Sequence, residues 1–490
     1  MLYDLWIGGE AIATDEHLVV RNPADRQMVL GRVSKGTVKH ANRAVADAKK
    51  AFLAWNRTPV HERTGVLWNI ATQMRQQRAE LIATIILETG KQWREADGDV
   101  AEAIDFCEFY SREMLRLSEP RTRHQPGEEN TYLYQGRGVC VVISPWNFPL
   151  AILTGMTVAP LVAGNTVICK PAEQSSLVAA KFARIVQNCD LPPGVFNFLP
   201  GTGEEVGARL VEHPDTSIIN FTGSVPVGTW INAKAAEMAE GQSHVKRVIA
   251  EMGGKNAIIV DNDADLDEAV KGIVASAFGY QGQKCSACSR LIVLPQVYPA
   301  FLPRLRHAVE SLVIGPPEDP ATQLGPVIDE EAFERLSTAL EQARKETPCV
   351  ASLPVDAWTE QGYYIGPHVF ADVAPQSFLG QTELFGPVLA ILPAADLDEA
   401  FRIANSTKYA LTGGIYSRNP AILQRAKQEF QVGNLYINRR ITGAEVDRQP
   451  FGGFGLSGIG AKAGGPDYLV QFTQPRTFTE NTLRHGFAPE

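Results

Sequence analysis

One cysteine has neighbours that could make it a nucleophile. Cys285 lies in the string GQKCSACSR (282–290), after a glycine-containing turn that follows a helix, and directly after Lys284. A neighbouring cation favours the thiolate, which is the nucleophilic form of cysteine. Cys288 completes a CxxC spacing, but no second CxxC or spaced histidine pair supplies the other ligands of a zinc site, so no metal is expected. Taken alone, the string favours two buried structural thiols, and a reactive thiol is favoured only together with the strings described below.

A carboxylate and an amide could serve such a thiol. Glu251 ends a short apolar run in IAEMGGKNA (249–257) and meets paired glycines, a setting that can raise a carboxylate's pKa to that of a general base. Asn147 lies in SPWNFP (144–149), directly after the run VCVVI, at the sheet edge where open α/β folds bind ligands. Its amide could donate to a developing oxyanion. The alternatives are a solvated carboxylate at a strand end and an asparagine that caps the next helix.

Two glycine-containing strings are candidates for phosphate binding. FTGSVPVG (221–228) places Gly223, Ser224 and Gly228 where a strand ends and a helix opens, so that backbone N–H groups and a hydroxyl could meet a pyrophosphate. GTGEEVG (201–207) is closer to the GxGxxG spacing but has one residue too many, and its two glutamates would repel phosphate. It is predicted to be a turn followed by the start of a helix.

Two acidic strings are candidates for ribose binding. KPAEQS (170–175) follows a strand and places Lys170 and Glu173 together, a cation and an acceptor suited to ribose hydroxyls. ELFGP (383–387) adds the carboxylate of Glu383 beside an aromatic residue and a Gly-Pro turn, and by itself is typical of an ordinary loop.

The elements that must position these residues are predicted from the apolar pattern. Residues 40–118 have helical spacing, whereas between residues 138 and 260 short β-branched runs alternate with segments of crossover length. The runs are VCVVI, NTVICK, VFNFLP, TSIINF and NAIIV. Such alternation predicts a parallel sheet with helices on its faces. A second α/β pattern begins with a helix at 265–278 and a strand near 291–294.

Length and composition exclude several classes of protein. With 490 residues, 44% of them hydrophobic and 21% charged, the chain is globular with more than one core. The 46 Lys and Arg against 55 Asp and Glu give a net charge of −9, which opposes binding to nucleic acid or to a membrane surface. The longest uncharged stretch, 138–169, is interrupted by prolines and is not expected to span a membrane. Seven cysteines, an odd and sparse set, and no signal-peptide pattern predict reduced thiols and a cytoplasmic location.

In this order, and over nearly the whole chain, the strings resemble the aldehyde dehydrogenase superfamily. They are SPWNFP, KPAE, FTGS, EMGGKN, GQKC, ELFGP and PFGG at 450–453. The resemblance implies that Cys285 is the nucleophile, that Glu251 is the general base, and that Asn147 with the Cys285 backbone N–H forms the oxyanion hole. It implies NAD as cofactor, and a set of cofactor-binding residues: Lys170 and Glu173 on the adenosine ribose, Gly223 and Ser224 near the pyrophosphate, Glu383 on the nicotinamide ribose, and the aromatic residues Trp146 and Phe385. Because Glu173 would repel a 2′-phosphate, NAD is predicted over NADP, although Lys170 partly offsets that repulsion.

The resemblance also implies the fold, an α/β aldehyde dehydrogenase-like architecture. Residues 1–121 and 141–250 would form a Rossmann-type parallel-sheet cofactor domain and 251–468 an α/β catalytic domain. Residues 122–140 and 469–490 would form a small β oligomerisation element, because the pieces at 131–134 and LVQFTQPRTFTE have strand composition and no obvious partner in either domain. A homo-oligomer, a dimer or larger, is therefore expected.

Four longer strings narrow the resemblance to the dehydrogenases that oxidise L-glutamate γ-semialdehyde, formed from 1-pyrroline-5-carboxylate, in proline degradation. They are QKCSACSR, INRRITGAEVDRQPFGG (437–453), AKAGGPDYL (461–469) and EAIDFCEFY (102–110). This resemblance implies that Ser286, with Lys284 nearby and the backbone of Gly443 and Ala444, anchors the substrate α-carboxylate, and that Glu102 meets its α-ammonium. A zwitterionic substrate needs one anion and several donors. For Glu102, a solvated helix face is the alternative.

Other functions remain open on the sequence alone. A dehydrogenase of another acid semialdehyde, such as succinate semialdehyde, would leave Glu102 without a partner. A cysteine hydrolase or acyltransferase without a redox cofactor would leave FTGSVPVG, KPAE and ELFGP unexplained, and a non-catalytic structural protein would leave every chemical position unexplained. The expected partners are a small-molecule substrate and a second copy of the chain, with fusion to or pairing with a proline dehydrogenase as a further possibility.

Overall fold

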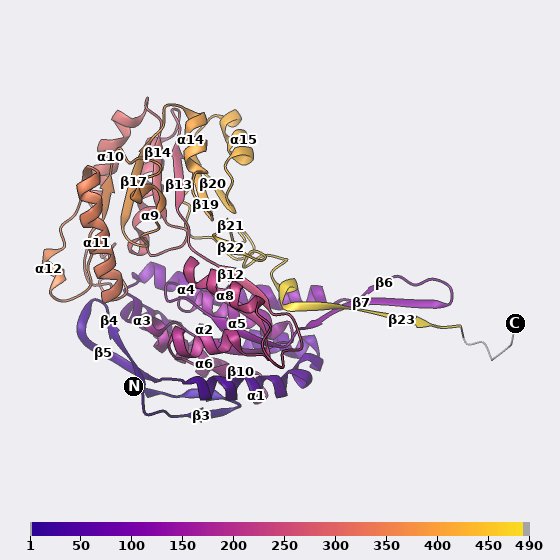
Figure 1. Ribbon diagram of the computed structural model, residues 1–490. Helices are drawn as coiled ribbons and strands as arrows, with labels where there is room; N and C mark the ends of the chain where they lie inside the picture. The colour runs from indigo at the N-terminus through magenta and orange to yellow at the C-terminus, as the bar shows by residue number, and fades with distance from the viewer. Residues whose placement is uncertain (1, 484–490) are drawn as a thin grey trace.

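Two large sheets, each covered by helices on both faces, build the two lobes of the chain (Figure 1). The computed structural model describes residues 2–483. In spatial order, the strands of the first sheet are β22 (Gly458–Ile459), β12 (Arg247–Glu251), β11 (Thr216–Thr222), β8 (Val139–Ile143), β9 (Thr166–Lys170), β10 (Phe196–Phe198), β2 (Leu5–Ile7) and β3 (Glu10–Ile12). Those of the second are β15 (Cys349–Ser352), β16 (His368–Phe370), β17 (Val388–Pro393), β14 (Cys288–Val293), β13 (Asn256–Val260), β19 (Thr412–Tyr416) and β20 (Asn434–Ile437).

The first sheet buries both of its faces, as its near-continuous apolar strands require. Along β8, Val139 and Val141 pack into one hydrophobic cluster while Cys140 and Val142 pack into another. The Cys140 face is covered by α2 (Val60–Gln76), α3 (Arg78–Thr89), α4 (Trp93–Ser118), α5 (Ala151–Val162) and α6 (Ser176–Gln187). The opposite face is covered by α1 (Val38–Arg57), α7 (Ala208–Glu212) and α8 (Val225–Ala236). The predicted helical opening and parallel sheet are confirmed.

The second sheet has the same layered construction. Its helices on one face are α9 (Leu266–Phe278) and α10 (Tyr298–Glu310), and on the other α11 (Glu330–Glu346), α14 (Leu397–Ala404) and α15 (Pro420–Glu429). Two short helices, α12 (Asp356–Thr359) and α13 (Phe378–Gln381), lie in its connections.

One predicted strand belongs to the other sheet. The run NAIIV is β13, which pairs with β14 and β19 of the second sheet, and the fifth parallel strand of the first sheet is β12. A short buried run specifies a strand but not its sheet. Here the paired glycines 253–254 stand between β12 and β13, where the chain passes from one lobe to the other. The string 201–207, by contrast, forms the predicted helix start, a helical turn (Gly203–Gly207) that runs into α7.

The parallel strands of the first sheet end at one edge. Ile143 of β8 is in register with Lys170 of β9 and with Phe221 of β11, and Thr222 is in register with Glu251 of β12. The loops that follow these strands therefore meet at the same edge, where open α/β sheets bind ligands.

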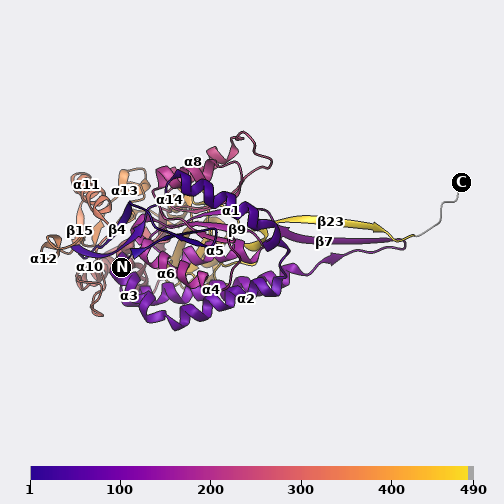
Figure 2. The ribbon, with the colours of Figure 1, turned by 90° about the horizontal axis from the view of Figure 1, so that it is seen from below.

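The two outlying strand-like pieces pair with each other. They form β7 (Glu128–Gly136) and β23 (Thr473–Asn481), which run antiparallel over nine residue pairs, with β6 (Arg121–Thr122) at the edge. This arm projects from the body in Figures 1 and 2. Part of the predicted oligomerisation element, residues 484–490, lies outside the described residues, and the predicted domain boundaries stay predictions.

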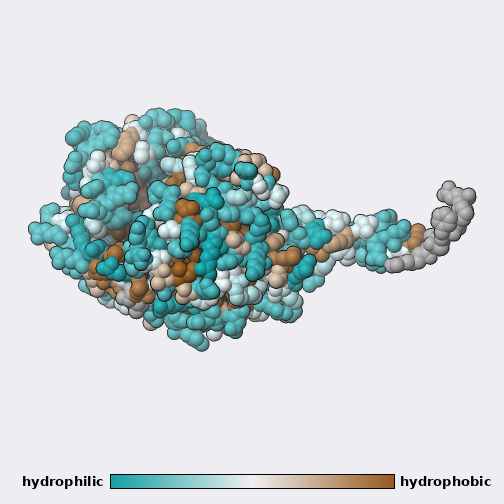
Figure 3. Space-filling model, turned by 60° about the horizontal axis from the view of Figure 1, so that its bottom comes forward, coloured by the Kyte–Doolittle hydropathy of each residue, from teal (hydrophilic) through white to brown (hydrophobic). Residues whose placement is uncertain are grey.

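Two smaller sheets complete the fold. β1 (Leu2–Tyr3), β5 (Asp25–Ser34) and β4 (His17–Asn22) form one, and β18 (Tyr409–Ala410) pairs with β21 (Phe454–Gly455) in the other. The face of the molecule in Figure 3 is mainly hydrophilic, with apolar residues scattered over it. Among the helices within residues 2–483, none is long and apolar enough to cross a membrane.

Candidate active site

Cys285 lies in the wall of a cavity between the two lobes. The loop that carries it follows a turn in which Tyr280 and Gln281 both have positive φ, 51° and 55°. The cavity has a volume of about 110 Å³. Its lining residues are Glu102, Phe106, Tyr110, Phe148, Ile152, Gly155, Met156, Thr222, Glu251, Met252, Cys285, Ser286, Gly443, Ala444, Phe451, Ala463 and Tyr468. The nucleophile, general base and substrate anchors expected from the sequence are thus brought together, except for Lys284.

A side-chain amide that the sequence analysis did not assign fixes the cysteine loop. Asn256, the first residue of β13, donates through Nδ2 to the carbonyl oxygens of Cys285, at 2.7 Å, and Ala287, at 2.9 Å. Its Oδ1 accepts from the backbone N–H of Thr412 at 3.0 Å. Asn256 stands in the string EMGGKN, but only this network distinguishes it from an ordinary polar residue at the start of a strand.

The environment of Cys285 favours the thiol and not the thiolate. Burial raises the pKa of Cys285 to about 12, and the carboxylates of Glu251 and Glu383 add to the increase. Lys284 does not offset them, because its ammonium donates to both carboxylate oxygens of Glu95, at 2.8 and 2.7 Å. The sequence-based interpretation that Lys284 favours the thiolate is wrong, and Lys284 is not among the residues that line the cavity.

Glu251 has the environment of a proton acceptor. It ends β12 and reaches the cavity, where its Oε2 atom is buried without a hydrogen-bond partner. Burial raises the pKa of Glu251 well above its usual value, and the charge of Lys462 only partly opposes this. The sheet edge thus holds a carboxylate with high proton affinity beside the thiol, whereas a solvated carboxylate would keep an ordinary pKa.

Asn147 lies in the turn between β8 and α5, and its side chain is nearly buried, with 5% exposed. Its Nδ2 donates to the carbonyl oxygen of Gln283 at 3.2 Å, two residues before Cys285. The N-cap position of α5 is Leu150, without a side-chain cap, so Asn147 does not cap this helix. The amide is therefore held beside the cysteine loop, with the donor chemistry that an oxyanion hole needs.

The expected substrate anchors also line the cavity, together with Glu102. Ser286, Gly443 and Ala444 line it, and Gly443 has a φ of 73°, which favours glycine. Glu102 projects into the same cavity from α4, so it does not lie on a solvated helix face. Burial, and next the nearby Asp99, raise the pKa of Glu102 to about 8.

The cofactor candidates lie at the edge of the first sheet. The Lys170 ammonium is buried and contacts the Glu173 carboxylate at 3.1 Å, and the Glu173 side chain is 35% exposed. Ser224 is the N-cap residue of α8, but its side chain accepts no hydrogen bond from the first N–H groups of the helix. A β-carbon on Gly223 would lie 2.6 Å from the ring of Phe221, so any larger residue there would have to displace that ring. An acceptor beside a cation and an open helix start fit the ribose and pyrophosphate of a dinucleotide.

The third group of candidate cofactor-binding residues, in the string ELFGP, belongs to the second lobe. The Oε1 atom of Glu383 accepts from the backbone N–H of Gly254 at 2.9 Å, which brings ELFGP to the paired glycines after β12. Phe385 has a φ of 53°, and its ring meets that of Trp146 edge-on, with the centroids 5.5 Å apart. Among residues 2–483, no group of three or more histidines, cysteines, aspartates or glutamates could hold a metal ion.

Comparison with known proteins extends the likeness to the whole chain. The aldehyde dehydrogenase family model matches residues 11–478. The chain is 49% identical to the 1-pyrroline-5-carboxylate dehydrogenase of Geobacillus sp. (strain WCH70) and 48% identical to 1-pyrroline-5-carboxylate dehydrogenase 2 of Bacillus subtilis (strain 168), in each case over 98% of this chain and 93% of the relative.

Solved structures show the same likeness over the whole chain. The 1-pyrroline-5-carboxylate dehydrogenase from Thermus with bound NAD superposes with a TM-score of 0.95 at 46% identity, over 98% of this chain and 93% of that one. Proline utilization A (PutA) from Bdellovibrio bacteriovorus superposes with a TM-score of 0.97 at 49% identity, over 100% of this chain, which spans about half (51%) of that longer chain. The chain belongs to the aldehyde dehydrogenase family.

Proposed function

We propose that this chain oxidises L-glutamate γ-semialdehyde, the open form of 1-pyrroline-5-carboxylate, to L-glutamate with NAD. The observation that carries the proposal is the cavity itself, which Cys285 and Glu251 line together with Glu102, Ser286 and the loop of Gly443 and Ala444. A zwitterionic aldehyde presents an ammonium and a carboxylate at one end and the reactive carbonyl at the other. The relatives named for 1-pyrroline-5-carboxylate support the same substrate.

The first step forms a covalent bond to the enzyme. The Cys285 sulfur adds to the aldehyde carbon, its proton passes to an acceptor in the cavity, and the carbonyl oxygen becomes an alkoxide. Glu251 is an acceptor with high proton affinity there, because burial raises the pKa of its carboxyl group. The Asn147 amide and the Cys285 backbone N–H would donate to the alkoxide and stabilise this thiohemiacetal.

The second half of the reaction releases the carboxylic acid product. The residues that would hold NAD are Lys170, Glu173, Gly223, Ser224, Trp146, Glu383 and Phe385, and the cofactor would supply the acceptor for the hydride of the former aldehyde carbon. Re-formation of the carbonyl leaves a thioester on Cys285. Glu251 first releases to solvent the proton that it took from Cys285, and then takes a proton from a water molecule that attacks the thioester. The carbon–sulfur bond breaks, the leaving sulfur takes that proton from Glu251, and glutamate is released with the Cys285 thiol restored while its new carboxyl group ionises to solvent.

Glu102 favours this substrate over succinate semialdehyde. Its carboxyl group lines the same cavity as Gly443 and Ala444, where an α-ammonium would bind it, and a substrate without that ammonium would leave the acid in the cavity unpaired. Succinate semialdehyde therefore remains the second candidate, disfavoured by this residue alone.

Assembly and location belong to the same proposal. The antiparallel arm of β7 and β23 would form the contact of a homo-oligomer, because the two strands pair with each other and project from the body. A cytoplasmic enzyme that receives its substrate from a proline dehydrogenase, either a separate chain or a fused one, fits the likeness to half of a PutA chain.

A panel of aldehydes tests the substrate. Wild type and Cys285→Ala would be assayed with NAD and glutamate γ-semialdehyde, succinate semialdehyde or a plain aliphatic aldehyde, and NADH absorbance followed. We expect the highest kcat/KM for glutamate γ-semialdehyde and no turnover by Cys285→Ala. A higher kcat/KM for succinate semialdehyde would contradict the substrate, and turnover by Cys285→Ala would contradict the mechanism.

A further inference from the structure

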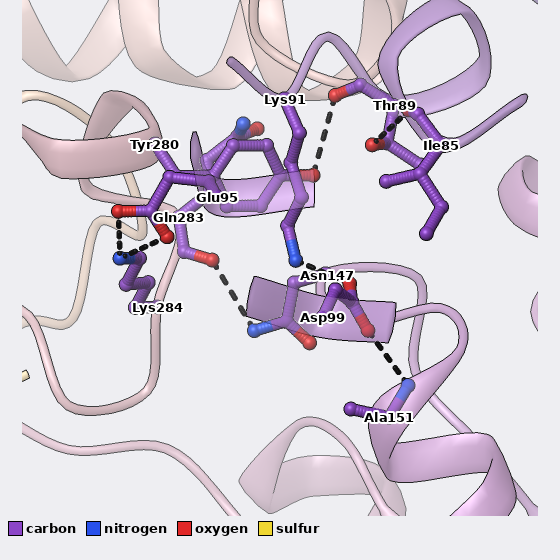
Figure 4. Close-up of polar contacts among 10 residues, drawn as sticks. All are labelled: Ile85, Thr89, Lys91, Glu95, Asp99, Asn147, Ala151, Tyr280, Gln283 and Lys284. Atoms are coloured by element: carbon purple, nitrogen blue, oxygen red, sulfur yellow. Dashed lines mark hydrogen bonds and ion pairs between the residues drawn. The ribbon is translucent and has the colours of Figure 1, made fainter. Parts of the chain in front are cut away.

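A fully buried ion pair lies behind the turn that carries Asn147. The Lys91 ammonium, between α3 and α4, contacts Oδ2 of Asp99 in α4 at 2.5 Å, and both side chains have 0% exposure (Figure 4). Burying two charges costs several kcal/mol per ion, and well-packed apolar side chains of the same volume often stabilise a fold equally well. The role of the pair is therefore better judged from the residues that it contacts than from its contribution to stability.

The acidic partner holds the start of α5. The second oxygen of Asp99, Oδ1, accepts from the backbone N–H of Ala151 at 2.7 Å, and Ala151 is the first residue of that helix. The N-cap residue of α5, Leu150, supplies no side-chain acceptor. Asp99 thus provides from α4 the negative charge that a helix N-terminus favours.

The basic partner lies between the two loops of the active site. The Lys91 Nζ atom is 3.8 Å from the centroid of the Phe148 ring and 4.9 Å from that of Tyr280. Phe148 directly follows Asn147 and lines the cavity, while Tyr280 belongs to the turn before Cys285 and donates to the carbonyl oxygen of Thr89 at 3.2 Å. One ammonium therefore contacts both segments through their aromatic faces.

The pair and the Asn147 amide lie in one connected arrangement (Figure 4). Asn147 donates to Gln283, on the cysteine side, while the residues that follow it are held by Lys91 through Phe148 and by Asp99 through Ala151. We infer that Lys91 and Asp99 are positioning residues: their ion pair fixes the turn at 147–151 against the cysteine loop, and so places the Asn147 amide where the alkoxide forms. The inference rests on the proposed function, in which Asn147 stabilises that alkoxide.

A double-mutant cycle between Asp99 and Asn147 tests the inference. Asp99→Asn keeps an oxygen for the Ala151 N–H but removes the charge that holds Lys91. We expect it to lower kcat/KM for the aldehyde by about 10- to 100-fold, as a small misplacement of a catalytic group does, with KM for NAD unchanged. In an Asn147→Ala background the same substitution should change kcat/KM by less than about threefold, because groups that act through one another are not additive.

The matched control lies in the same helix. Asp97 pairs with Arg78 at 2.6 Å on the exposed face of α4, with side chains 49% and 41% exposed. Asp97→Asn should leave kcat/KM unchanged in both backgrounds. If Asp99→Asn leaves too little folded protein, Lys91→Met/Asp99→Asn, which removes both charges and keeps the oxygen for Ala151, replaces it in the cycle.

The possible outcomes distinguish a failure of the positioning role from a failure of the proposed function. A loss that disappears in the Asn147→Ala background supports the positioning role, since a general loss of stability would lower the activity of both backgrounds equally. If Asn147→Ala slows the enzyme but Asp99→Asn acts additively or has no effect, the positioning role is overturned and the proposed function stands. If Asn147→Ala retains full turnover, the oxyanion assignment and the positioning role are both overturned.

Discussion

Lys284 donates to both carboxylate oxygens of Glu95, at 2.8 and 2.7 Å, although it directly precedes the nucleophile candidate in the chain. Burial alone would raise the pKa of Glu95, but the charge of Lys284 lowers it. The ammonium is thus used to hold α4 against the cysteine loop. With that cation occupied, Cys285 has a raised pKa and is expected to lose its proton during attack, not before it.

This environment predicts a slow, strongly pH-dependent alkylation of Cys285 by iodoacetamide in the absence of substrate. The rate should still be rising above about pH 10, because the thiolate is the reactive form. Glu251→Gln removes the carboxylate whose charge raises the pKa of Cys285, so at pH values where Glu251 is ionised it should lower that pKa and speed the reaction. Lys284→Gln should leave the profile unchanged.

The exposed Cys349 serves as the control in the same chain. Alkylation of each cysteine would be followed by mass spectrometry of the peptides, and the exposed Cys349 should react in every variant. Fast alkylation of Cys285 at neutral pH in wild type, or its loss in Lys284→Gln, would restore Lys284 as the activating cation.

Glu102 predicts a pH dependence of substrate binding. Its pKa of about 8 means that it holds a proton at neutral pH and gains its negative charge as the pH rises past 8. Only the charged form pairs with an α-ammonium, so KM for glutamate γ-semialdehyde should fall between about pH 7 and pH 9. Glu102→Gln should raise KM by about 10- to 100-fold at pH 9 and remove this fall.

The cyclisation of the substrate also changes with pH, so wild type and Glu102→Gln are compared in the same solutions. A plain aliphatic aldehyde should show equal KM for both proteins. Parallel pH profiles for the two proteins with glutamate γ-semialdehyde would refute the role of Glu102, and equal losses for both aldehydes would favour succinate semialdehyde.

Glu173 predicts the choice between the two nicotinamide cofactors. Its carboxylate is partly exposed beside Lys170 and would repel a 2′-phosphate. The ratio of kcat/KM for NAD to that for NADP should exceed one in wild type and fall by about tenfold or more in Glu173→Gln. Thermal unfolding checks that the variant stays folded, and a wild-type preference for NADP would show that Lys170 dominates instead.

The sequence predicted four parallel strands of the first sheet, β8, β9, β10 and β11, because their β-branched runs are buried on both faces and bounded by turns, but it did not predict β12. It also placed Asn147, Lys170 and Glu251 correctly at strand ends, since polar residues that follow such runs meet at one sheet edge. It did not place NAIIV in its sheet, because a five-residue buried run carries no information about its partner strands.

The partners of charged side chains could not be predicted from the sequence. Lys284 was assigned by its neighbour in the chain, but its ion pair is with a residue 189 positions away. Asn256 and the pair of Lys91 and Asp99 likewise act through contacts between distant segments. Spacing along one element can be predicted from periodicity, whereas such pairs depend on how elements pack.

The close approach of Glu383 to the paired glycines gives a test of the cofactor site that leaves the nucleophile untouched. A β-carbon on Gly253 would lie 1.9 Å from the Oε2 atom of Glu383, so Gly253→Ala must displace that carboxylate. Because hydrogen bonds to a charged group contribute about 1.5–3 kcal/mol, KM for NAD should rise by about 10- to 100-fold. The rate of Cys285 alkylation should change much less than this.

Gly65→Ala is the control, since Gly65 lies in α2 with nothing within 4 Å of the added carbon. Alanine there should keep the wild-type KM for NAD and slightly raise the midpoint of thermal unfolding. An unchanged KM for NAD in folded Gly253→Ala would remove Glu383 from the proposed nicotinamide-ribose site.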